Sequence, residues 1–186
     1  MDSNWFKPAL KFTKVIYGKK LLLKGIPVIF NKKGAKIWIG DGVTIKSSFL
    51  SNLVGLYART IIVTRTPEAE IIIGNHVGIS GATIYARESI RIGDHTMVGG
   101  NVKILDNDFH PLEVEARNQD EKAKIEARPI IIGKNCFIGC NTIILKGTVL
   151  GDGCIVGAGA VVSGQYGNGS VIAGNPGRVV KELRMG

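Results

Sequence analysis

Residues 132–161 read, in blocks of six, IGKNCF IGCNTI ILKGTV LGDGCI VGAGAV. Each block begins with Ile, Leu or Val, and four of the five have Gly in second place. The fifth place always holds a small side chain: Cys136, Thr142, Thr148, Cys154 and Ala160. A period of six fits neither an amphipathic helix nor an alternating strand, whose periods are about 3.6 and about 2. The pattern predicts a short strand and a tight turn, repeated, with the first residue of each block pointing inward.

The same pattern runs through much of the preceding sequence. A weak start lies at Ile39, in the block IGDGVT. Clearer blocks begin at Ile73, Ile79 and Tyr85 and, after a slip of one residue at Arg91, at Ile92, Val98 and Ile104. Three blocks make one triangular coil, and stacked coils pair as parallel strands about 4.8 Å apart. The expected fold class is therefore all-β, with a buried column of Ile, Val and Leu.

Composition narrows the class of protein. The chain has 186 residues, which predicts about one domain. With 45% hydrophobic and 21% charged residues it is too apolar for disorder. No apolar run reaches the roughly 18 residues that a membrane-spanning helix needs. Three Cys give no disulfide framework, and Cys136 and Cys154 are interpreted as buried small fillers of adjacent coils rather than a metal or redox pair.

The positive charge is concentrated at the N-terminus. The net charge is +9, and residues 1–33 hold eight Lys and a single acid, Asp2, so they contribute +7 of it. The nearly neutral remainder argues against a nucleic-acid partner for the main fold. Lys19, Lys20 and Lys24 interrupt the apolar stretch that a secretory signal would need, so we expect a cytoplasmic protein.

The repeat divides the chain into three parts. Residues 1–33 form a basic segment that we expect to cap the first coil; contact with an anionic membrane is the less favoured interpretation. Residues 34–180 form the β-helix, with insertions near 49–70 and 111–129. Residues 181–186 form a tail. Long non-repeat insertions of this kind are usually either functional or disordered.

Among the three His, one stands in a distinctive context. His76 and His95 take the fourth place of their blocks and are expected to be solvated turn residues. His110 closes the stretch ILDNDFHP, immediately before the second insertion, with Asp106 and Asp108 nearby. A His whose pKa lies near neutrality can take a proton from a hydroxyl, and a carboxylate can orient and stabilise it. His110 is the candidate general base.

The repeat resembles that of the hexapeptide-repeat acetyltransferases, whose fold is a left-handed parallel β-helix. DNDFHP resembles the catalytic loop of the sugar O-acetyltransferases, including the maltose, galactoside, capsule and exopolysaccharide enzymes. The resemblance implies that His110 deprotonates an acceptor hydroxyl, which attacks the thioester of acetyl-CoA directly in a ternary complex. It implies acetyl-CoA as co-substrate, no metal and a loop protruding after the catalytic His. It also implies a homotrimer with sites at subunit interfaces.

The last residues carry a second resemblance. SVIAGNPGRVVKELR resembles the family's closing segment, in which a GNPA-type turn leads into a short basic helix; here Gly177 replaces the usual Ala. Small residues let a pantetheine arm lie along the backbone, and cations meet its phosphates. The residues that the resemblance assigns to CoA are Phe137, which replaces the Trp of many relatives, Gly139, Ala158, Arg178 and Lys181.

The acceptor side rests on fewer features. The candidate acceptor-binding residues are Ser80, Asn101, Asp106, Asp108 and Arg117. The expected acceptor is a small molecule or glycan precursor whose identity the sequence does not fix. N-acetylation, or acetylation of a xenobiotic on the same fold, stays open as an alternative, as does an inactive scaffold. A γ-type carbonic anhydrase, which would need His76, His95 and His110 around one zinc, is the remote alternative.

Overall fold

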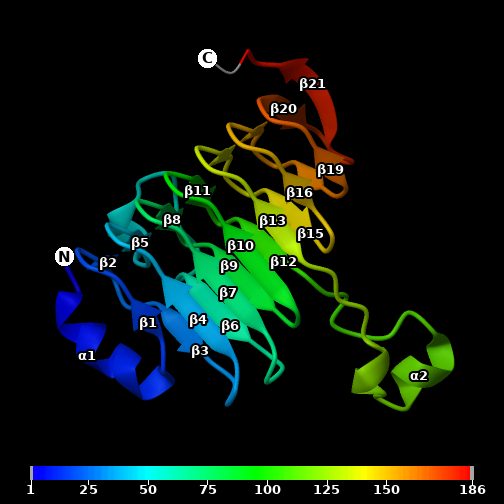
Figure 1. The fold of residues 1–186 in the computed structure, drawn as a ribbon, viewed down its shortest axis with the longest axis horizontal. Coiled ribbons are helices and arrows are strands. Elements are labelled where there is room, and N and C mark those ends of the chain that lie inside the picture. Colours follow the sequence, from blue (N-terminus) through cyan, green and yellow to red (C-terminus); the bar gives the residue numbers. More distant parts are fainter. Residues whose placement is uncertain (1, 185–186) are drawn as a thin grey trace.

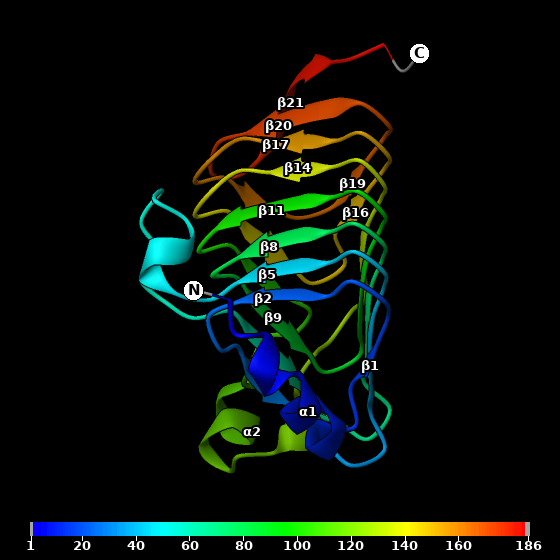
Figure 2. The ribbon, with the colours of Figure 1, turned by 90° about the vertical axis from the view of Figure 1, so that its left-hand side faces the viewer.

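The computed structural model describes residues 2–184, which wind into a left-handed parallel β-helix (Figures 1 and 2). The first face holds β1 (Ile16–Tyr17), β4 (Lys36–Ile39), β7 (Glu70–Ile73), β10 (Ser89–Ile92), β13 (Ile130–Ile132), β16 (Val149–Leu150) and β19 (Gln165–Tyr166). The second face holds β2 (Leu22–Lys24), β5 (Thr44–Lys46), β8 (Gly78–Ser80), β11 (Met97–Gly100), β14 (Phe137–Ile138), β17 (Ile155–Val156), β20 (Ser170–Ala173) and β21 (Arg178–Glu182). The third face holds β3 (Val28–Phe30), β6 (Ile61–Thr64), β9 (Thr83–Ala86), β12 (Lys103–Leu105), β15 (Ile143–Leu145) and β18 (Val161–Val162).

Helical structure lies outside the coils. The short helices are α1 (Lys7–Leu10), α2 (Val114–Asn118) and the 3-10 turns Asn4–Phe6, Lys11–Thr13, Phe49–Ser51 and Lys122–Lys124. Figure 2 places α1 at the open end of the first coil. Figure 1 shows α2 within a loop, residues 106–129, that projects away from the coils. Among residues 2–184, none of the helices has the length and hydropathy needed to span a bilayer.

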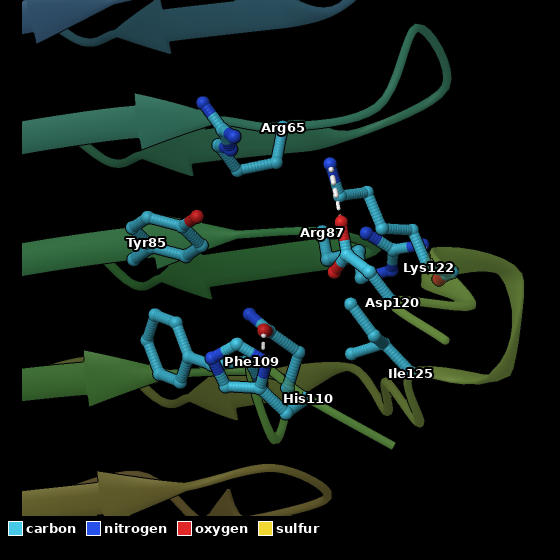
Figure 3. A pocket seen from close by; sticks show the side chains of 9 residues that line it. Arg65, Tyr85, Arg87, Phe109, His110, Asp120, Lys122 and Ile125 are labelled. Carbon is cyan, nitrogen blue, oxygen red and sulfur yellow. Dashed lines mark hydrogen bonds and ion pairs between the residues drawn. The ribbon is translucent and has the colours of Figure 1, made fainter. Parts of the chain in front are cut away.

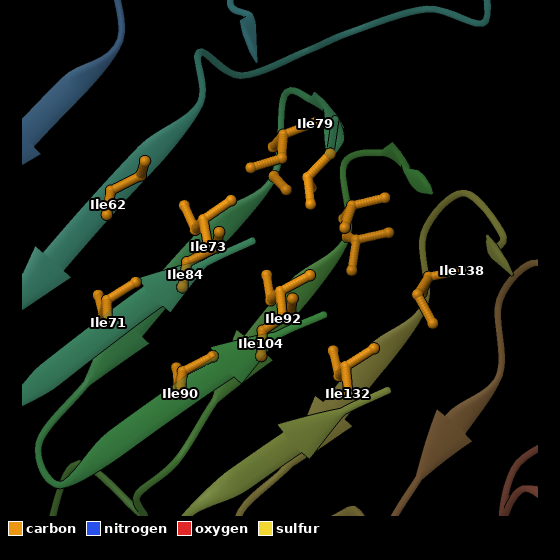
Figure 4. Packing of buried hydrophobic residues seen from close by; sticks show 14 of the residues in the cluster. Ile62, Ile71, Ile73, Ile79, Ile84, Ile90, Ile92, Ile104, Ile132 and Ile138 are labelled. Carbon is orange, nitrogen blue, oxygen red and sulfur yellow. The ribbon is translucent and has the colours of Figure 1, made fainter. Parts of the chain in front are cut away.

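The core is a stack of aliphatic side chains from all three faces (Figure 4). On the third face Ile62, Ile84, Ile104 and Ile144 are in register through the pairs β6–β9, β9–β12 and β12–β15. All four are fully buried. Burying each such side chain contributes about 1.5–3 kcal/mol to the free energy of folding, compared with leaving it exposed. The repeat places one at every turn of the coil, so their burial is the main source of stability.

The glycines of the second place allow the coils to stack closely. A Cβ added to Gly93 would lie 2.6 Å from the carbonyl carbon of Gly133 in the next coil. The neighbouring Asx side chains bind the backbone of the preceding coil: Asp94 Oδ1 accepts from the N–H of Asn75, and Asp152 Oδ1 from that of Lys134, each at 2.7 Å. The IGD and IGN sequences therefore specify this corner of the triangle.

We expect Ile84→Val to lower the free energy of unfolding by about 0.5–1.5 kcal/mol, because one buried methylene is lost from a tightly packed column. The matched control is Ile131→Val on the first face, where the side chain is 43% exposed and the loss is expected near zero. Urea unfolding of both variants gives the comparison. Equal values for the two variants would contradict the assignment of the inward face.

The coils begin earlier than the sequence predicts. β1, β2 and β3 pair in parallel with β4, β5 and β6, so residues 16–30 already form a coil, and the cap is confined to the residues before them. The predicted start at residue 34 is wrong because this coil uses LLLKGIPVIF, with few of the glycines that mark later coils. Its inward Leu23 is fully buried.

Two further boundaries differ from the prediction. The first insertion spans residues 47–60, not 49–70, because β6 already belongs to the third face. The predicted short C-terminal helix is wrong: β21 pairs antiparallel with β20, joining Ala173 to Arg178 and Val171 to Lys181. Without β21, the edge of β20 at the end of the last coil would be unpaired. The β-branched Val179 and Val180 favour the strand that covers this edge.

Candidate active site

The DNDFH stretch forms a tight turn at the corner between the third and first faces. It follows β12, and Asn107 Oδ1 accepts a hydrogen bond from the N–H of Phe109 at 2.9 Å. Phe109 has a φ of 65°, and the N–H of His110 donates to the carbonyl of Asp108 at 2.7 Å. This turn leaves the His110 side chain exposed, as a general base that must meet an incoming substrate requires.

A cavity of about 260 Å³ adjoins His110 (Figure 3). One wall is aromatic: the rings of Tyr85, on β9, and Phe109 lie 4.8 Å apart at 47°. The remaining lining comes from the neighbouring coils and from the 106–129 loop, and comprises Arg65, Arg87, Asn107, Asp120, Lys122 and Ile125. The cavity therefore brings the imidazole of His110 together with an aromatic surface and several cationic side chains.

Asp106 lies under this cavity and does not face it. Its carboxylate is fully buried and accepts from the N–H groups of Arg87 and Glu88 and from Nδ2 of Asn107, at 2.7–3.0 Å. Burial raises the pKa of Asp106 even though these hydrogen bonds act in the opposite direction. The position of Asp106 does not favour the predicted contact with the acceptor, because its oxygens already hold the corner of the coil together.

Asp108 points to the other side of the loop. Its Oδ2 is ion-paired with Nζ of Lys146, which also contacts Oε2 of Glu126 at 2.8 Å. Burial alone would lower the pKa of Lys146, but the hydrogen bonds and charges of Asp108 and Glu126 outweigh it and raise that pKa. Through this ion pair Asp108 anchors the loop, and it also lines a second cavity together with Lys146 and Ser163, so its contact with the acceptor stays a prediction.

We expect Lys146→Met to speed hydrogen exchange of the 106–129 loop amides roughly two- to fivefold near neutral pH, because a partly screened ion pair contributes modestly. Exchange is compared with wild type at the same pH. Lys146→Met should leave the coil amides unchanged, and Lys134→Met, which alters an exposed Lys, is the matched control.

The pH dependence of this effect has a definite sign. The hydrogen bond and charge of Lys146 lower the pKa of Glu126 below its ordinary 4.5, so its contribution is present above 4.5 and is lost as pH falls through the lowered value. The raised pKa of Lys146 keeps its own contribution intact up to 10.5. The exchange ratio should fall toward one as the pH drops through the lowered pKa of Glu126; a ratio that stays unchanged over that range would contradict the role of the ion pair.

Three other predicted acceptor residues hold loops in place. Ser80 Oγ accepts from Nδ2 of Asn52 at 3.1 Å. Asn101 Oδ1 accepts from the N–H of Tyr57 at 3.2 Å, and its Nδ2 donates to a carbonyl of the same 47–60 insertion at 2.9 Å. Both are buried on the second face, away from the corner of His110. Arg117, on α2, donates to the carbonyl of Leu112 at 2.8 Å and does not line the His110 cavity.

The residues assigned to CoA lie together on the later coils. Phe137 is exposed on β14 and shares a surface hollow with Ser80 on the second face. Gly139 and Ala158 are at the corner between the second and third faces, where a Cβ on Gly139 would lie 2.5 Å from the backbone nitrogen of Ala158. Arg178 and Lys181 are exposed on β21. Within one chain these residues lie on the second face and at its corner with the third face, whereas His110 lies at the corner between the third and first faces.

The two remaining His form a pair of their own. The rings of His76 and His95 stack at 4.9 Å and 17° in left-handed turns between the first and second faces. His110 lies at another corner, so the structure does not bring the three together as a zinc site would require. Among residues 2–184 no group of three or more potential metal ligands was found. Burial raises the pKa of Cys136 to about 11, consistent with an unreactive filler.

The sequence did not single out Tyr85, Arg65 or Arg87. The block beginning at Tyr85 predicted that this ring points inward, but Ile84 and Ala86 are the buried residues and Tyr85 faces outward over Phe109. A signal was present: the slip at Arg91 shows that the frame changes near this block. The two arginines follow the ends of their third-face strands, which the repeat alone does not mark.

Comparison with known proteins supports the fold. Residues 129–163 match the family model described as the hexapeptide repeat of succinyl-transferase. No curated protein matches the chain. AntD, an N-acyltransferase from Bacillus cereus solved with dTDP and coenzyme A, is 21% identical over 99% of this chain and 92% of its own, with a TM-score of 0.74.

Two sugar acetyltransferases are also similar. A maltose O-acetyltransferase from Clostridium difficile 630 is 21% identical, covering 98% of this chain and 79% of its own, with a TM-score of 0.61. A galactoside acetyltransferase in complex with coenzyme A is 27% identical, covering 67% of this chain and 65% of its own, with a TM-score of 0.55. The chain thus contains the hexapeptide repeat and shares the left-handed β-helix of the hexapeptide acetyltransferases.

Proposed function

We propose that the chain transfers an acetyl group from acetyl-CoA to a hydroxyl of a sugar or glycan precursor. The observation that carries the proposal is the exposed His110 beside an aromatic-walled cavity, in a loop whose DNDFHP sequence resembles the catalytic loop of sugar O-acetyltransferases. The three free thiols, Cys136, Cys140 and Cys154, suit the reducing cytoplasm in which we place the reaction.

The chemistry follows from a single base. The neutral imidazole of His110 takes the acceptor's hydroxyl proton as the oxygen forms a bond to the thioester carbon. The tetrahedral intermediate carries its negative charge on the former carbonyl oxygen, and backbone N–H groups are suited to stabilise it. When the carbon–sulfur bond breaks, the CoA thiolate leaves and receives the proton from the imidazolium. No covalent enzyme intermediate is needed.

The later coils fit a CoA arm. The corner at Gly139 and Ala158 offers backbone without protruding side chains, so an extended pantetheine can lie against it. Arg178 and Lys181 offer cations to its phosphates. Because these groups lie apart from the His110 corner within one chain, we propose that a homotrimer joins the His110 corner of one subunit to the Phe137 surface of the next.

N-acylation is the second candidate. It is favoured by the similarity to AntD, which extends over 99% of this chain with a TM-score of 0.74. The two candidates differ in the nucleophile, since an amine that arrives protonated must also lose a proton before it attacks.

Release of free thiol from acetyl-CoA tests the proposal. Purified protein is supplied with matched acceptor pairs that differ only in a hydroxyl or an amine, and the acetylated product is located by NMR. Thiol release that requires the hydroxyl acceptor supports O-acetylation; release only with the amine supports the second candidate. If the protein binds CoA but releases no thiol with any acceptor, the assignment of CoA as donor is kept and the proposed acceptor class is rejected.

A further inference from the structure

The His110 cavity carries a concentration of positive charge. Arg65 follows β6, Arg87 follows β9, and Lys122 lies in the loop, so three cations from separate segments line one small space (Figure 3). A single lining carboxylate, that of Asp120, opposes them. It is ion-paired with Nζ of Lys122 at 3.1 Å.

Within residues 2–184 neither Arg65 nor Arg87 has a carboxylate partner. Nη2 of Arg87 donates to the backbone carbonyl of Lys122, which fixes the guanidinium toward the loop. Arg65 lies over the ring of Phe30, with its central carbon 5.7 Å from the ring centroid. A guanidinium has five N–H donors, so each retains several for a ligand.

We propose that the acceptor is anionic and that Arg65 and Arg87 bind a phosphoryl or pyrophosphoryl group attached to the sugar. Arginine matches phosphate oxygens with pairs of parallel hydrogen bonds, and two arginines on adjacent coils suit an anion with several oxygens. The aromatic wall of Tyr85 and Phe109 suits the face of a sugar ring next to it. His110, on the same cavity, then meets a hydroxyl of that ring.

The size of the cavity sets the scale of the bound group. A volume of about 260 Å³ lies just under the roughly 300–1,000 Å³ typical of small-molecule sites. One sugar with its phosphate fits this space, and the rest of a larger acceptor extends outside it. The carrier beyond the phosphate is a nucleoside or a lipid, and the experiment separates these two.

Binding is measured first, without the reaction. Calorimetry with glucose 1-phosphate, UDP and inorganic pyrophosphate is carried out on wild type, Arg65→Gln, Arg87→Gln and Arg91→Gln. Arg91 is an exposed first-face arginine that pairs with Glu70 and lies outside the cavity. We expect each cavity variant to weaken anion binding about 10- to 100-fold, the effect of losing one charge-assisted contact, and Arg91→Gln to leave it unchanged.

Turnover then tests the acceptor class, and this part rests on the proposed function. Thiol release is compared for a neutral sugar, a uronic acid, a nucleoside-diphosphate sugar and a polyprenyl-pyrophosphate sugar. The proposal predicts release with one or both pyrophosphate acceptors, and loss of that release in the cavity variants with CoA binding intact. The nucleotide and lipid arms identify the carrier.

Several outcomes would overturn the inference. The first is that wild type binds none of the three anions, and the second is that the cavity variants bind them as tightly as wild type does. The third is that the neutral sugar or the uronic acid is turned over as fast as the pyrophosphate acceptors. Loss of the oligomer in Arg65→Gln and Arg87→Gln, seen by analytical ultracentrifugation, would assign the arginines to a subunit contact instead. Anion binding through both arginines without any CoA binding would preserve this inference and refute the proposed function.

Discussion

We expect His110→Ala to lower turnover by about 10²–10⁴-fold, the usual contribution of general-base catalysis, while the affinity for CoA stays at the wild-type value. The expectation follows from position: His110 is exposed on a tight turn after β12, while the residues suited to CoA lie on the later coils. Because its side chain is not part of the core, the substitution should leave the unfolding free energy nearly unchanged.

The measurement combines three readings on one protein preparation. Thiol release gives kcat and KM for the acceptor, calorimetry gives the Kd of CoA, and urea unfolding gives the stability. His95→Asn is the matched control, since His95 is also an exposed turn His. Its left-handed φ of 59° is one that Asn accepts, as Asn135 shows with a φ of 54°. Turnover in His110→Ala within threefold of wild type would refute the mechanism.

The sequence predicts the β-helix because its repeat records a geometric requirement at every coil. Close contact between stacked coils requires Gly in second place, a small residue in fifth place and an inward Ile or Val. The approach of Gly93 to Gly133 illustrates this requirement. The first coil meets the same requirement with Leu23 and a different turn chemistry, so the period was not visible there. β21 forms because the edge strand β20 needs a hydrogen-bonding partner. The six-residue repeat carries no information about that edge.

The candidate site was predicted less completely for a related reason. DNDFHP marks the position of His110, but the direction in which each polar side chain points depends on which coil lies beside it. Asp108 forms an ion pair with Lys146, and Asn101 accepts a hydrogen bond from the 47–60 insertion. Conversely, Tyr85 faces the cavity because the frame shifts by one residue. Residues that converge from separate coils, such as Arg65 and Arg87, have no shared motif.

Asp106 gives the clearest test of this distinction, because the same residue was predicted to bind the acceptor. Asp106→Ala would leave the N–H groups of Arg87 and Glu88 without their acceptor inside the corner between β9 and β10. An unpaired buried donor costs about 1–3 kcal/mol, so we expect the free energy of unfolding to fall by about 2–5 kcal/mol. Urea unfolding measures it, with Glu115→Ala, which removes an exposed carboxylate from the same loop, as control.

The pH dependence of Asp106 provides a second, independent reading. Burial raises its pKa in the folded protein above the ordinary 3.8, so between these two values the folded state binds more protons than the unfolded state. Its contribution to stability therefore decreases as pH rises through that window and is constant above it. Asp106→Asn, which keeps one oxygen acceptor but does not titrate, should lose this slope. Wild-type stability in Asp106→Ala, together with a raised KM for the acceptor, would instead return Asp106 to the acceptor site, because a ligand contact changes binding while a buried corner contact changes folding.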